Sequence, residues 1–161
     1  MVASISIRVF TGASAATMSD AVSGIDFESA DNAVNSLANR KLYPITVGNN
    51  SFEKWLKARV DVAPDNYVQN FLVWSDGGVM ANTALYYGIE TSGATPTASK
   101  SSKAIHDFSS VTAAAKGTWD AAQLVNVADL SKFLVFQLCT STAAPPGNWT
   151  QETINYSYDE A

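Results

Sequence analysis

Histidine and cysteine, which supply much of the chemistry of enzymes and metal sites, are almost missing from this sequence. The 161 residues include one cysteine, Cys139, and one histidine, His106. A lone cysteine excludes an internal disulfide and any zinc site built from four cysteines. A catalytic triad would have to use His106, but the adjacent Asp107 points to the opposite face if the two lie on a strand. We therefore expect His106 on the surface and Cys139 as a small buried apolar residue.

Charged residues are also few. They form 16% of the chain, against about 25% in typical soluble domains. The net charge is -5, and the lysines and arginines are scattered along the sequence. Lys54, Lys57 and Arg59 form the one local cluster, which fits the solvated face of a strand. Nucleic-acid binding needs a concentrated basic surface, so we expect no nucleic-acid partner.

Long apolar runs are absent as well. No segment approaches the roughly 18 consecutive apolar residues of a membrane-spanning helix. The first residues, MVASISIRVF, lack the apolar stretch of a signal peptide. We expect synthesis in the cytoplasm and no membrane partner.

Apolar residues nevertheless make up 47% of the chain and aromatic residues 11%, which is enough to close a hydrophobic core in one domain. Their spacing is mostly two residues, which is typical of strands with one buried face. Residues 4–9 alternate polar and apolar side chains, and residues 56–62 do so without a break. In the second segment Lys57, Arg59 and Asp61 fall on one face, so a register shift of one residue would bury three charges.

Further segments have the composition of strands and are separated by turn residues: 67–74, 84–90, 133–139 and 153–158. The second of them contains Gly88, which predicts a bulge or a close approach of another backbone segment. Segment 133–139 is the most continuously apolar, so we expect it to be a central strand.

Helical signals are weak. A short helix is predicted over residues 29–37, where a serine or aspartate can cap its N-terminus, and a turn or two over 112–116 and 120–125. Long loops rich in Gly, Ser, Thr, Ala and Pro are predicted over 11–23, 91–103 and 141–148. Several short strands with turns and long loops between them predict an all-β, single-domain fold over residues 1–161, either a β-sandwich or a jelly-roll-like barrel.

Paired carboxylates are the remaining route to an enzyme, because a glycosidase needs only two. Asp76 and Glu90 are the candidates for such a hydrolase. Most acidic residues of this chain, however, fall at turns or strand ends, where turn geometry alone explains them. The spacing of a calcium-binding EF-hand loop is absent around Asp76. We expect no catalytic, cofactor-binding or metal-binding residues, and a protein that is not an enzyme.

Aromatic residues offer binding surfaces. Trp55 and Trp74 lie within predicted strands and are expected in the core. A carbohydrate-binding, lectin-like module would instead use Trp119, Trp149 or the pair at 86–87, because aromatic rings stack on sugars. Trp149 follows a Pro-rich loop, and we expect it to be exposed as an interface anchor. The predicted interface residues are Phe10, Trp119, Pro145, Pro146 and Trp149.

Several short motifs follow one another in order from about Leu42 to the C-terminus. They are FEKWL at 52–56, WSDGG at 74–78, YYG at 86–88 before TP at 95–96, FLVFQL at 133–138, an Ala-Pro-Gly loop at 144–147 and TINYSYDE at 153–160. Their order resembles a family of small structural proteins of tailed-bacteriophage virions that end in a Tyr-Asp-Glu-like strand.

This resemblance implies a virion protein that is made in the host cytoplasm and binds the major capsid protein or other virion proteins. Capsid decoration or cement is the first function it implies, and a tail or head-fibre component is the alternative. A homo-oligomer, by analogy a trimer at threefold positions of a shell, would suit decoration.

The resemblance also divides the chain into a sandwich body over residues 42–160 and an N-terminal segment, residues 1–40, that lies outside it. We expect this segment to form an arm that grips a neighbouring subunit. Removal of the first dozen residues would then weaken shell binding without unfolding the domain. A carbohydrate-binding module is the hypothesis outside the virion.

Overall fold

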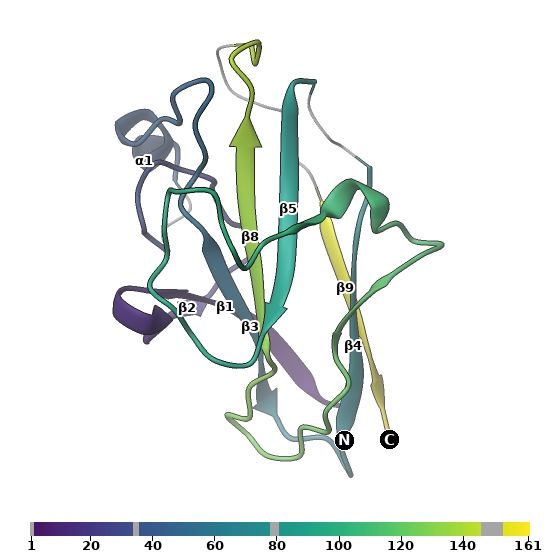
Figure 1. Cartoon of the computed structure of the whole chain (residues 1–161). Coiled ribbons are helices and arrows are strands. Elements are labelled where there is room, and N and C mark those ends of the chain that lie inside the picture. The colour runs from purple at the N-terminus through teal and green to yellow at the C-terminus, as the bar shows by residue number, and fades with distance from the viewer. Residues whose placement is uncertain (1, 34–35, 78–80, 146–152) are drawn as a thin grey trace.

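The computed structural model describes residues 2–33, 36–77, 81–145 and 153–161, and in these ranges two antiparallel sheets pack face to face (Figure 1). The predicted all-β sandwich is therefore confirmed. None of the helices in these ranges is long and apolar enough to cross a membrane.

Within the described residues, the larger sheet has six strands in the order β2-β1-β3-β8-β5-β6. Their bounds are Thr17–Ala21 (β2), Ser4–Thr11 (β1), Lys54–Val62 (β3), Phe133–Thr140 (β8), Thr83–Glu90 (β5) and His106–Asp107 (β6). The smaller sheet consists of Gly117–Asp120 (β7), Val68–Ser75 (β4) and Ile154–Glu160 (β9), in the order β7-β4-β9. The continuously apolar β8 lies inside the larger sheet, as predicted, and is almost completely buried.

The main hydrophobic core lies between the two sheets. The side chains of β3 that point into it are those predicted from the alternation: Leu56, Ala58 and Val60. On the other face of β3, Lys57 and Arg59 are half-buried. Lys54, which was predicted to be solvated with them, is instead buried.

Strand β4 contributes to the same core in spite of a break in its alternation. Val68 and Phe71 are three residues apart, yet both are buried. The register of β4 against β9 shifts between Gln69 and Leu72, and Asn70 has a φ of 54° in the left-handed region. The extra residue of this bulge restores the inward direction of the side chains that follow.

A second, smaller core covers the outer face of the larger sheet. Its buried members are Phe10, Ala15, Trp55, Ala104, Phe133 and Val135. The predicted loop 91–103 does not extend into solvent but crosses this face, and we call it the strap (Figure 1). A Cβ atom on Gly88 would lie 1.9 Å from the carbonyl oxygen of Lys103, so the predicted close approach at Gly88 is confirmed.

The α-helix of the described residues, α1 (Leu37–Leu42), begins where the predicted helix over 29–37 ends. Ser36 caps it, because its side chain accepts a hydrogen bond from the backbone N–H of Asn39 at 3.1 Å. The predicted helical turns over 112–116 and 120–125 are wrong. Their alanines favour a helix, but the pairing of β7 with β4 fixes an extended backbone between them.

The first part of the chain does not form an arm. Strand β1 lies between β2 and β3, with Phe10 opposite Trp55, and Val9 is buried in the main core. Removal of the first dozen residues would delete this inner strand, so we expect such trimming to destabilise the fold and not only to weaken shell binding. Strand β2 falls within the predicted loop 11–23, and its mostly exposed side chains suit the edge of a sheet.

Candidate functional site

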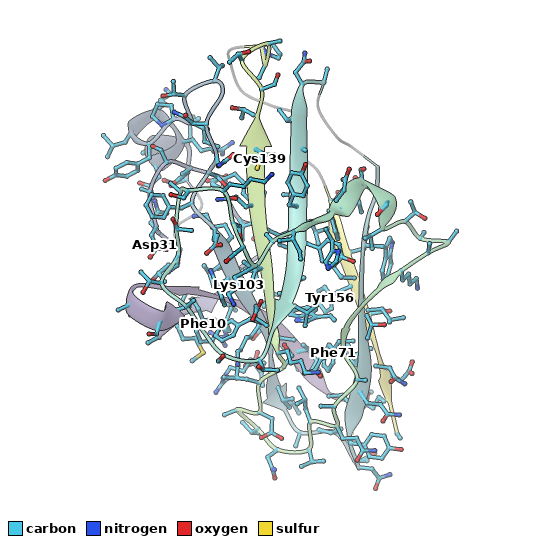
Figure 2. All side chains as sticks on the ribbon, in the orientation of Figure 1. Phe10, Asp31, Phe71, Lys103, Cys139 and Tyr156 are labelled. Atoms are coloured by element: carbon cyan, nitrogen blue, oxygen red, sulfur yellow. The ribbon has the colours of Figure 1, made fainter. Side chains whose placement is uncertain are left out.

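Two of the predicted interface residues lie in the core. Phe10 is 7% exposed and packs edge-on against Phe133, with ring centroids 5.2 Å apart (Figure 2). Trp119 is 2% exposed, and its indole N–H donates to the carbonyl oxygen of Lys132 at 2.9 Å. The pairing of β7 with β4 turns the Trp119 ring toward Phe71. Neither ring can anchor a partner while the sandwich is folded, which corrects the prediction for these two residues.

Of the other predicted interface residues, only Pro145 is described. Pro145 is exposed and follows the buried Ala144. Pro146 and Trp149 lie outside the described residues. Their role as interface anchors therefore stays a prediction.

The aromatic residues considered for sugar stacking do not form an open platform in the described part of the chain, which does not include Trp149. Tyr86 and Tyr87 are half-buried on β5, and the ring of Tyr87 packs against Phe108 with centroids 5.3 Å apart. Trp74 packs partly against the main core, and the ammonium of Lys116 lies 4.1 Å from the centroid of its ring. A sugar would have to displace this cation–π contact to stack on Trp74.

The two carboxylates considered for a hydrolase have separate partners in separate sheets. Glu90 ends β5, and its carboxylate lies 3.5 Å from Lys103 Nζ. Asp76 follows β4 and accepts a hydrogen bond from the N–H of Thr153 at 3.2 Å. In the part of the chain that the structure describes, no three His, Cys, Asp or Glu side chains gather in a group that could hold a metal ion.

Cys139 is half-buried on β8 rather than fully buried as predicted (Figure 2). Burial raises the pKa of its thiol, and the positive charge of Lys100 partly offsets this effect. A thiol with a raised pKa carries little thiolate at neutral pH, so Cys139 is a poor nucleophile.

Exposed apolar side chains gather around α1. We call this set the α1 patch, and its members are Leu37, Leu42, Tyr43 and Val47. Leu37 is 49% and Leu42 66% exposed, and α1 itself has no buried residue. A six-residue helix has little stability of its own and normally packs an apolar face on the core. Exposed apolar side chains that lie close together in this way are typical of interaction surfaces.

Polar contacts attach the α1 patch to the sandwich. Arg40 Nε lies 3.4 Å from Asp26 Oδ1, and the N–H of Ser29 donates to the carbonyl oxygen of Tyr43 at 3.0 Å. After the patch, the carbonyl oxygen of Asn49 accepts a hydrogen bond from the N–H of Thr140 on β8 at 3.1 Å. The apolar side chains are thus carried by a segment that is held at Arg40 and Tyr43 and again at Asn49.

A polar groove of about 580 Å³ lies beside the α1 patch and shares the segment around Val47 with it. The residues that line it are Ser29, Ile45, Thr46, Gly48, Asn49, Asn50, Ala98, Ser99 and Lys100. Its lining is rich in amides and hydroxyls and includes one cation. Groups of this kind bind polar ligands through hydrogen bonds.

A buried hydrogen-bond network holds the strap against the larger sheet and so fixes one wall of the groove. Gln137 on β8 donates from Nε2 to the carbonyl oxygens of Ser51, Thr97 and Ser99, at 3.0, 3.3 and 2.8 Å. Its Oε1 accepts a hydrogen bond from the N–H of Ser101 at 2.8 Å. Sequence reasoning missed this role, although Gln137 is the one polar residue in the motif FLVFQL.

A second set of exposed apolar residues lies at the opposite end of the sandwich. We call it the valine group, and its members are Val62, Val125 and Val127. Val62 ends β3, whereas the α1 patch is attached near the end of β8 (Figure 1). The loop that holds the other two valines is bound to β3 by a hydrogen bond from the N–H of Val60 to the carbonyl oxygen of Asp129 at 3.0 Å.

Comparisons of this chain with protein-family models, with curated proteins and with solved structures found no match. The bacteriophage resemblance therefore stays a prediction, and the functional assignment depends on the surfaces described above.

Proposed function

We propose that this chain is a structural protein of a bacteriophage virion and that it binds the shell of the major capsid protein as a decoration or cement protein. The α1 patch is the observation that carries this proposal, because it presents apolar side chains on a fixed segment at one end of a sandwich. The order of the sequence motifs supports the choice of a virion shell as the partner.

The composition of the α1 patch suits a protein partner. Protein interfaces combine central apolar anchors with a polar rim that gives specificity. Leu42 and Tyr43 would be the anchors, and Arg40 and Lys41 beside them would form a basic rim. The complementary surface of the shell would be apolar at its centre and acidic at its edge. A contact of this kind repeated at many symmetry-related positions would stabilise a shell.

The valine group leaves a separate surface for contacts between copies of this chain. Because it lies at the other end of the sandwich, self-association through Val62, Val125 and Val127 would not compete with shell binding. A trimer is the form that fits the threefold positions of a shell. A tail or head-fibre component would use the same surfaces in fewer copies per particle.

The polar groove favours a second candidate function, which is carbohydrate binding. The amides of Asn49 and Asn50 and the hydroxyl of Thr46 are groups that hydrogen-bond sugar hydroxyls, and Lys100 would select an acidic sugar. A lectin-like module would use this groove rather than Trp119, which is buried.

Quantitative mass spectrometry of purified particles from the source tests the proposal by counting copies of this chain against the major shell protein. We expect on the order of hundreds of copies per particle, as decoration of symmetry-related positions requires. A few dozen copies or fewer would assign the chain to the tail or fibres. Absence of the chain from the particle would contradict a virion role and make carbohydrate binding the leading function.

A further inference from the structure

Three buried side-chain oxygens without a hydrogen-bond partner among the described residues lie within five consecutive residues between β2 and α1. They are Glu28 Oε1, Asp31 Oδ1 and Asn32 Oδ1. Glu28 is 1% exposed, so bulk water does not solvate its carboxylate. Buried polar atoms in folded proteins are nearly always paired, and unpaired carboxylate oxygens are especially costly. A cation bound at this segment would satisfy unpaired oxygens of this kind.

Contacts to β1 and β3 hold this segment in place. The amide nitrogen of Asn32 donates to Glu28 Oε2, which leaves the other oxygen of each side chain unpaired. Lys54 Nζ on β3 donates to the backbone carbonyl of Asn32 at 2.7 Å. The N–H of Gly12, just after β1, donates to Asp31 Oδ2 at 2.7 Å (Figure 2). The oxygens are therefore positioned by the sandwich and not by a free loop.

Lys54 does not satisfy the unpaired oxygens. Its ammonium bonds to a backbone carbonyl, and the ion pairs found in the described ranges do not include it. The carboxylates of Glu28, Asp31 and Asp26 lie near the ammonium of Lys54. Asp26 is already paired with Arg40. The carboxylates of Glu28 and Asp31 thus carry two negative charges beside the single positive charge of Lys54, in a site with little access to water.

We propose that Glu28, Asp31 and Asn32 form a calcium-binding site. Calcium takes carboxylate, amide and water oxygens in a flexible geometry, whereas magnesium requires a nearly ideal octahedron. The three unpaired oxygens offer two carboxylate ligands and one amide ligand, and waters would complete the shell. Zinc prefers nitrogen and sulfur ligands, which this segment does not supply.

A bound calcium ion would stiffen the segment on which α1 depends. Residues 26–33 contact the α1 patch through the Asp26–Arg40 ion pair and the hydrogen bond between Ser29 and Tyr43. The ion would therefore fix the base of the patch whatever its partner is. This inference does not rest on the proposed virion function, since it starts from oxygens that have no partner among the described residues.

Calcium titration of the EDTA-treated full-length protein tests the inference, by calorimetry and by thermal unfolding. The variants are Glu28→Gln and Asp31→Asn, and Asp20→Asn on the exposed edge strand β2 is the matched control. With a Kd on the order of 1 mM, about 10 mM calcium should raise the Tm of the unmodified protein by about 3–5 °C. We expect no rise in the Glu28 and Asp31 variants and a full rise in the Asp20 variant.

An unmodified protein that gives neither binding heat nor a Tm shift with calcium overturns the inference. An equal response of all the variants overturns it too, because the ion would then bind elsewhere. A shift that sodium chloride of the same ionic strength reproduces has the same consequence. Circular dichroism establishes that each variant is folded, and Asp31→Asn carries the test if Glu28→Gln does not fold, since Asp31 is the less buried of the two.

Discussion

Gln137 interrupts the most apolar strand of the chain because the strap must be held across the larger sheet. The strap brings backbone carbonyls over β8, and a buried carbonyl needs a donor. A glutamine side chain offers both donors and an acceptor, so one residue can pair with Thr97, Ser99 and Ser101 of the strap. Glu53 has a similar role beside it, since its carboxylate accepts a hydrogen bond from the hydroxyl of Ser101 as well as one from the indole N–H of Trp55 at 3.0 Å.

The first prediction concerns this residue. Gln137→Met keeps the approximate volume of the side chain but leaves the buried carbonyl of Ser51 and the buried N–H of Ser101 without the partner that Gln137 supplies. We expect the free energy of unfolding to fall by about 3 kcal/mol, since each unpaired buried group costs about 1–3 kcal/mol. Urea unfolding measures the loss. Gln123→Met is the matched control at an exposed site and should stay within about 0.5 kcal/mol of the unmodified protein.

For single residues, the candidate site was harder to predict from the sequence than the core was. Trp119 was expected at an interface because its neighbours read as helix and loop, but strand pairing turns it inward. The α1 patch was missed because Leu42 is exposed only if no other segment of the chain covers it. The sequence around Leu42 does not show whether a distant segment packs there. The proposed calcium ligands were missed for a related reason, since it is their lack of partners that distinguishes them.

At the scale of elements, strands with one buried face were predicted well and edge strands were not. β3 was recognised from its apolar residues in period two and β8 from its continuous apolar run, while β4 and β5 were recognised from apolar and aromatic residues between turns. β2 and β6 have mostly exposed side chains, and β7 is four residues long, so none of them shows a clear alternation. Their place in the sheets is fixed by their neighbours, which a single segment of sequence does not reveal.

Two valine variants test whether β1 is an inner strand of the sheet or part of an arm. Val9 on β1 is 1% exposed, whereas Val2, just before the strand, is 80% exposed. Val9→Asp places an unpaired charge in the main core, and we expect it to destabilise the protein by about 3 kcal/mol or more, with loss of near-ultraviolet circular dichroism. Val2→Asp makes the same chemical change outside the sheet and should leave the Tm nearly unchanged. Equal stability of the two variants would mean that β1 is not an inner strand.

At the scale of the whole molecule, the two ends of the sandwich present different surfaces. The end with α1 combines an apolar patch, a basic rim and a polar groove, while the other end presents the valine group and the exposed Val2, which lies shortly before the residue paired with Val62. The sheets between them form a rigid spacer, because their inner faces are closed by the main core and the strap covers part of the outside. A molecule built in this way can bind one partner at each end without a change in shape.

The last prediction assigns shell binding to one end. Leu42→Glu puts a charge in the α1 patch, and because Leu42 is exposed the variant should fold normally. We expect its affinity for shells that lack this protein to fall at least about tenfold, equivalent to roughly 1.4 kcal/mol, in a co-sedimentation assay. Val127→Glu makes a similar change in the valine group and should bind shells as the unmodified protein does, although its self-association should weaken. The reverse result, with binding lost in Val127→Glu and kept in Leu42→Glu, would transfer shell binding to the valine group and leave α1 to contacts between copies.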